Sequence, residues 1–112
     1  MDDQTLQFVE IANRLKRGTA EGKVLWEKTG SYGHQFTAGL DNGHRALVAA
    51  SPSGKAVLFT MTSAQGVETL HLDSSRVNNE LLRLALLQLF VTVRDTLTHH
   101  VVSEAMDAVK DL

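Results

Sequence analysis

The spacing of hydrophobic positions divides the chain into three zones. Near the N-terminus, Phe8, Ile11, Ala12 and Leu15 follow the spacing of one helical face. This pattern predicts a helix over residues 4–17, with Gly18 as its stop. From Lys23 to Leu72 the helical period gives way to short runs separated by turn residues. These runs predict strands near 23–29, 34–41, 44–51, 56–62 and 67–72, with turns at 30–33, 41–43, 52–54 and 64–66.

The turn residues also predict how the strands pair. Asn42-Gly43 favours a two-residue hairpin, because both residues accept a positive φ. Such a turn sets Leu40 opposite Arg45, Ala38 opposite Leu47 and Phe36 opposite Ala49. A similar turn at Ser53-Gly54 sets Val48 opposite Phe59 and Ala49 opposite Leu58. In this register neither face of the sheet is clearly polar, so we expect both faces of the central strands to be covered.

The third zone, from Val77 to Leu112, contains no glycine and no proline. It predicts a helix from about Val77 to at least Leu97. One broad apolar stripe on this helix would cover the sheet: Leu82, Ala85, Leu86, Leu89, Phe90, Val93 and Leu97. A second, narrower stripe has heptad spacing and is interrupted by Arg94: Leu84, Leu87, Val91, Thr98, Val101, Ala105, Ala108 and Leu112.

The course of this zone beyond Leu97 is open to two interpretations. The helix could continue and present the second stripe as a short coiled-coil seam. Alternatively, it could break near His99–Ser103, where Val101 and Val102 are mediocre helix formers and Ser103 could cap a new helix. The tail would then fold back over its own core.

Together these patterns predict one α+β domain spanning residues 1–112: a five-stranded antiparallel meander with a short N-terminal helix and a long C-terminal helix packed on it. The run Thr19-x-x-Gly22-Lys23-x-x-Trp26 lies between the first helix and the first strand. It resembles small bacterial domains of unknown function, in which a helix leads through T-x-x-G-K-x-x-W into several strands and a leucine-rich helix. The resemblance implies the fold and carries no activity.

Composition narrows the classes of partner. The formal net charge is −2 and aromatic residues make up 5% of the chain, so we expect neither nucleic-acid nor membrane binding. The acidic N-terminus lacks the apolar run of a signal peptide. The chain has no cysteine, which suits a reducing compartment. We therefore expect a cytoplasmic location.

The residues with catalytic potential do not form a motif. His99 and His100 are adjacent and diverge on a helix, whereas a helical metal chelate has i,i+4 spacing. No serine lies in a G-x-S-x-G elbow, and the glycines of the 30–33 turn lack the lysine and the helix of a phosphate loop. We therefore expect no enzyme activity, no cofactor and no metal.

The surplus apolar stripe predicts association instead. The leading hypothesis is a non-catalytic protein–protein interaction module, a homodimer that associates through the C-terminal helix at Leu84, Leu87, Val91, Val101 and Ala105. One alternative is a small-ligand-binding or sensor domain with a pocket near Trp26, Phe36 and Phe59. Another is a small subunit of a heteromeric bacterial complex, with the same stripe bound to a larger protein.

Overall fold

The computed structural model describes residues 3–30 and 34–112. It confirms the α+β fold, with the order α1 (Asp3–Ala20), β1 (Trp26–Thr29), β2 (Gln35–Gly39), β3 (Arg45–Ala50), β4 (Val57–Thr62), β5 (Glu68–Asp73) and α2 (Glu80–Val109). The five strands form one antiparallel sheet in the order β1-β2-β3-β4-β5, which is the predicted meander. Residues 31–33 of the first predicted turn lie outside the described ranges.

The end of α1 differs from its prediction. The helix continues past Gly18, and the backbone N–H of Lys23 donates to the Gly18 carbonyl at 2.8 Å. The positive φ that ends the helix belongs to Gly22, at 76°. Gly18 is needed for space, because a Cβ there would lie 2.8 Å from Cγ2 of Val24. The chain therefore turns tightly into β1.

The register of the β2–β3 hairpin also differs from the predicted one. Its turn has three residues, Asp41–Gly43, so the Leu40 N–H donates to the His44 carbonyl at 2.7 Å. This register pairs Phe36 with Val48 and Ala38 with Ala46, one residue away from the predicted pairs. The predicted β3–β4 register is confirmed, with Val48 opposite Phe59 and Ala49 opposite Leu58.

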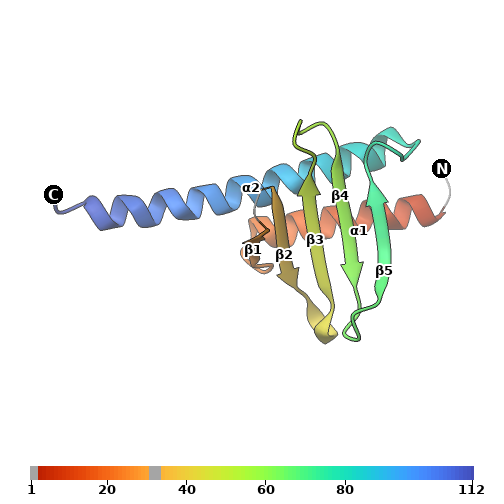
Figure 1. The fold of residues 1–112 in the computed structure, drawn as a ribbon, viewed down its shortest axis with the longest axis horizontal. Coiled ribbons are helices and arrows are strands. Elements are labelled where there is room, and N and C mark those ends of the chain that lie inside the picture. The colour runs from red at the N-terminus through yellow and green to blue at the C-terminus, as the bar shows by residue number, and fades with distance from the viewer. Residues whose placement is uncertain (1–2, 31–33) are drawn as a thin grey trace.

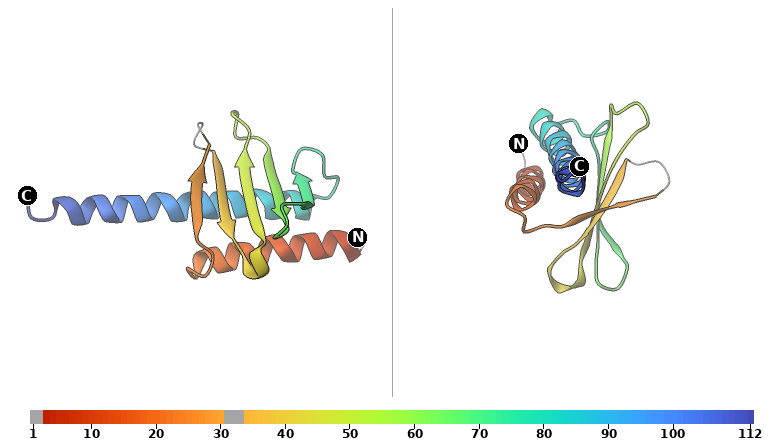
Figure 2. Two further views of the ribbon diagram at one scale, coloured as in Figure 1. Left: turned by 60° about the horizontal axis from the view of Figure 1, so that its bottom comes forward. Right: turned by 90° about the vertical axis from the view of Figure 1, so that its left-hand side faces the viewer.

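A slip of one residue exchanges the faces of a strand, so this correction changes the sheet. One face gathers the buried residues Trp26, Phe36, Ala38, Ala46, Val48, Val57, Phe59 and Leu72. Figure 2 shows that α1 and α2 both lie on one side of the sheet. Among the described residues nothing covers the other side, where Thr37, Leu47 and Thr60 form a half-buried row. The expectation that both faces are covered was wrong for the single chain, because it rested on the slipped register.

Helix α2 begins three residues later than predicted. Asn79 is its N-cap, and the Asn79 side chain accepts a hydrogen bond from the Leu82 N–H at 2.9 Å. The predicted stripe supplies the core: Leu82, Ala85, Leu86, Leu89, Phe90 and Val93 are buried, and Leu97 is partly buried against them. The helix runs without a break through His99–Ser103. The structure therefore has the continuous helix and not the folded-back tail.

Candidate functional site

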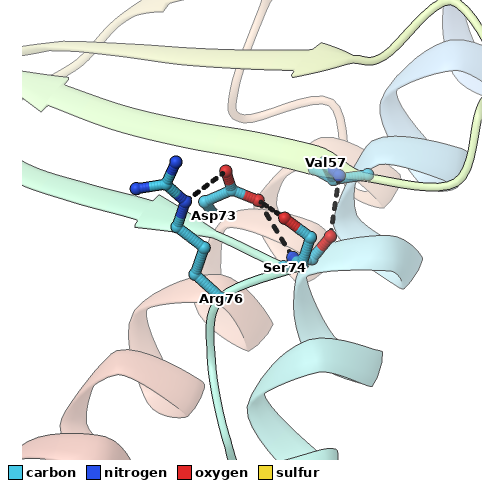
Figure 3. Close-up of polar contacts among 5 residues, drawn as sticks. Val57, Asp73, Ser74 and Arg76 are labelled. Atoms are coloured by element: carbon cyan, nitrogen blue, oxygen red, sulfur yellow. Dashed lines mark hydrogen bonds and ion pairs between the residues drawn. The ribbon is translucent and has the colours of Figure 1, made fainter.

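A short turn follows β5 and precedes α2 (Figure 3). Ser74 is buried, and its hydroxyl accepts a hydrogen bond from the Val57 N–H at 2.8 Å. One oxygen of the Asp73 carboxylate accepts from the Ser75 N–H at 2.9 Å and from the Ser75 hydroxyl at 2.7 Å. These bonds lower the pKa of Asp73 below its ordinary value of 3.8, with a smaller contribution from the charge of Arg76. The turn thus joins the end of β5 to the start of β4.

Only the first part of α2 packs on the domain (Figure 1). The helix crosses behind the strands and then extends beyond β1. We call residues 98–112 the arm, and every one of them is exposed. The arm presents large apolar side chains to solvent: Val101, Val102, Met106, Val109 and Leu112. A helix segment without tertiary contacts would be expected to be polar on all sides, so these residues need an explanation.

The second stripe forms a continuous line along α2, and its last member, Leu112, lies three residues beyond the end of the helix. We call this line the outer seam, and it consists of Leu84, Leu87, Val91, Arg94, Thr98, Val101, Ala105, Ala108 and Leu112. These residues alternate at intervals of three and four, which places them along one side of the helix. The seam joins the packed part of α2 to the arm.

The predicted interface residues differ in how much of each side chain is exposed to solvent. Leu84, Val91 and Val101 are 44%, 41% and 64% exposed, and Ala105 is exposed in the arm. Leu87 is half-buried and packs against the hydrophobic core. Leu87 therefore serves the fold as well as the seam, which the sequence pattern alone did not distinguish.

Two hollows open beside the seam, and Arg94 lines both of them. The first lies where the arm leaves the sheet, and its other lining residues are Lys28, Phe36, Leu97, Thr98, Val101 and Val102. The second lies between α2 and the β3–β4 loop, and is lined there by Ser51, Pro52, Ser53, Gly54, Leu87 and Val91, among others. We call the two hollows together the Arg94 groove. Sequence reasoning missed Lys28 and the loop, since only the tertiary fold brings them to α2.

The charges along α2 are unevenly distributed. The Arg94 groove carries the cations of Lys28 and Arg94. Arg94 donates from Nε to Oδ1 of Asp95 at 3.1 Å, and its guanidinium carbon lies 6.0 Å from the centre of the Phe90 ring. The arm has the opposite balance, with Glu104, Asp107 and Asp111 against the single cation Lys110. The arm is therefore acidic where the groove is basic.

The residues of the predicted ligand pocket lie in the core. Trp26, Phe36 and Phe59 are 6%, 4% and 1% exposed. Trp26 borders a hollow beside Val93 and Leu97, whereas Phe36 borders the Arg94 groove. The indole N–H of Trp26 donates to the Thr19 hydroxyl at 2.8 Å, which ties β1 to α1. These side chains fill the interior between sheet and helices.

Two surface histidines among the described residues lie beside carboxylates. Within residues 3–30 and 34–112, no group of three or more histidine, aspartate or glutamate side chains is arranged to hold a metal ion. His71 and His100 each lie beside a glutamate on the surface, at 3.3 Å from Glu68 and 3.4 Å from Glu104. Along the described residues, none of the helices combines the length and the apolar content that crossing a bilayer requires.

Comparison with known proteins adds no relative to this description. No protein-family model matches the chain, and neither the curated proteins nor the solved structures give a match.

Proposed function

We propose that the protein is a non-catalytic interaction module that forms a homodimer through the outer seam of α2. The observation that carries the proposal is the arm, an extension of α2 in which every residue is exposed, including its large apolar side chains. Exposed apolar surface of this extent on a helix is typical of a docking surface. A second copy supplies the same seam, so symmetric pairing covers both surfaces at once.

The apolar side chains of the seam supply the energy for association. Burying a valine or leucine side chain contributes about 1.5–3 kcal/mol. Two copies of Leu87, Val91, Val101 and Leu112, all partly or fully exposed in the single chain, together offer on the order of 10 kcal/mol. Association itself costs about 4–15 kcal/mol, and the lower end of this cost leaves about 6 kcal/mol, so we expect a dimer with a dissociation constant of tens of micromolar.

The test is the mass of the protein in solution. In sedimentation equilibrium the mass should rise with concentration from the 12.3 kDa of one chain and approach twice that value well above the expected dissociation constant. Val101→Glu should shift the protein to the monomer, because it places a charge in the middle of the paired seam. Val101 is 64% exposed and belongs neither to the core nor to the partly buried residues packed against it, so this change spares the fold of the single chain.

Ser103→Glu is the matched control. It adds the same charge to the arm two residues away, at a heptad position on the opposite side of the helix from the seam. The control variant should remain dimeric. A wild-type chain that stays monomeric at 100 µM, or a Ser103→Glu variant that dissociates as readily as Val101→Glu, contradicts the proposed dimer.

A further inference from the structure

We infer that the two copies pair antiparallel, with the acidic arm of each lying along the Arg94 groove of the other. This inference rests on the proposed function and adds the direction and register of the pair. In an antiparallel coiled coil, a and d positions of one helix oppose d and a positions of the other. Centring the pair between His99 and His100 satisfies this rule for the seam residues from Leu87 to Leu112 and leaves Leu84 outside the paired part. It opposes Leu87 to the partner's Leu112, Val91 to the partner's Ala108, Arg94 to the partner's Ala105, and Thr98 to the partner's Val101.

The sizes of the opposed side chains fit this register. The large residues of the packed part, Leu87, Val91 and Arg94, meet positions of the arm that include the two alanines Ala105 and Ala108. Small residues leave room for an arginine side chain to lie across the seam and keep its charged end in water. The groove on the packed part is bounded by the β3–β4 loop, which lies beside Leu87 and Val91 of the seam.

The charges favour the same direction. Arg94 would lie one position from the partner's Glu104, on a groove that also carries Lys28. A parallel, in-register pair would instead oppose Arg94 to its own copy in the seam. The antiparallel pair replaces this repulsion with the attraction between Arg94 and the partner's Glu104. The antiparallel arrangement also places the two folded domains at opposite ends of the paired helices.

Cysteine crosslinking tests the direction, because the natural chain contains no cysteine to interfere. Val91→Cys and Ala108→Cys are both at exposed positions of α2. Mixed together under mild oxidation, the two variants should form the 91–108 disulfide, detected by mass spectrometry. Each variant alone should not crosslink, since two copies of residue 91 would lie about 25 Å apart along the helices. A disulfide requires Cα atoms within about 7 Å.

The possible outcomes test the antiparallel direction separately from the homodimer. A 91–91 disulfide in the single variant means a parallel pair, which overturns the antiparallel arrangement and leaves the homodimer standing. A wild-type chain that is monomeric in sedimentation removes the homodimer itself. A dimer in which the mixture gives no 91–108 disulfide also overturns the stated register.

Charge reversal provides a second measurement on the same dimer. Arg94→Glu should raise the dissociation constant about tenfold, because it occurs at two symmetric positions of the pair. Adding Glu104→Arg should recover most of the lost affinity. Arg45→Glu, which makes the same change on an exposed strand position, is the control and should leave the dissociation constant unchanged. A double variant weaker than Arg94→Glu alone contradicts the pairing of these two residues.

Discussion

Replacing Thr19 by valine tests the joint between the first helix and the sheet. Thr19 is 1% exposed, and its hydroxyl accepts the indole N–H of Trp26 at 2.8 Å while donating to the Leu15 carbonyl at 2.7 Å. Valine has nearly the same shape, so the change removes the hydroxyl without opening a cavity. The indole N–H is then buried with no acceptor from Thr19.

The expected cost follows from that unpaired donor. A buried donor left without its partner costs about 1–3 kcal/mol. Leu15 loses less, because its carbonyl still accepts the backbone hydrogen bond of the helix. We expect Thr19→Val to lower the free energy of unfolding by about 2 kcal/mol. For a chain of this length the melting temperature should fall by about 10 °C.

Urea unfolding measures this cost well, since Trp26 is the only tryptophan and reports on the joint itself. The variants must be compared at one chain concentration, because association adds to apparent stability. Circular dichroism follows Trp26→Phe and the double variant, which lack the fluorophore.

The double-mutant cycle decides the interpretation. Thr19→Val and Trp26→Phe remove the same hydrogen bond, so the double variant should lose about 1–2 kcal/mol less than the sum of the single variants. Strictly additive losses, or a loss below about 0.5 kcal/mol for Thr19→Val, would show that this hydrogen bond does not hold α1 to β1.

Two further changes test local features of the fold. Gly43→Ala should cost about 1–3 kcal/mol in urea unfolding, because Gly43 has a φ of 78° and a Cβ there would lie 2.8 Å from Cβ of Ala64; a neutral effect would contradict the three-residue turn. Asp73→Asn should reduce the amount of stability that the protein loses as the pH falls. The lowered pKa of Asp73 stabilises the folded state above pH 3.8, and this contribution is lost as the pH falls through the folded-state pKa. If the variant loses as much stability in acid as the wild type, the result argues against the turn in Figure 3.

The helices could be predicted from sequence because their apolar spacing is set by one local period. The core stripe of α2 was found residue by residue, from Leu82 to Val93, since each residue faces the same side. The end of α1 was misplaced because a glycine both stops helices and allows close approach. At Gly18 the second role applies, and only the position of Val24 reveals it.

The hairpin register was harder to predict, because the same residues suit two turns. Asn42 and Gly43 both adopt positive φ, as the two-residue turn would require, yet Asp41 joins them in a three-residue turn. One signal in the sequence favours the observed register. It places Phe36 and Val48 together on the face that also holds Phe59. A sheet with one covered face needs this grouping.

Part of the candidate site could be predicted from the spacing of residues along one helix, and part depends on the tertiary fold. The seam follows from heptad spacing along one helix, so its members Leu84, Val91 and Val101 could be named from sequence. The Arg94 groove depends on where β1 and the β3–β4 loop lie relative to α2, and so Lys28 entered only with the fold. Charge complementarity between groove and arm was therefore invisible in the sequence pattern.

The arm links the stability of the helix to association. Isolated helices of fewer than about 12–15 residues are marginal in water, and Val101 and Val102 are weaker helix formers than alanine or leucine. Packing on the domain supports α2 only as far as Leu97. In the proposed dimer the groove of the second copy supplies the remaining support. Part of the free energy of burial is then used to order the arm, which lowers the affinity of the two copies for each other. Pairing also depends on the helix being continuous through His99–Ser103.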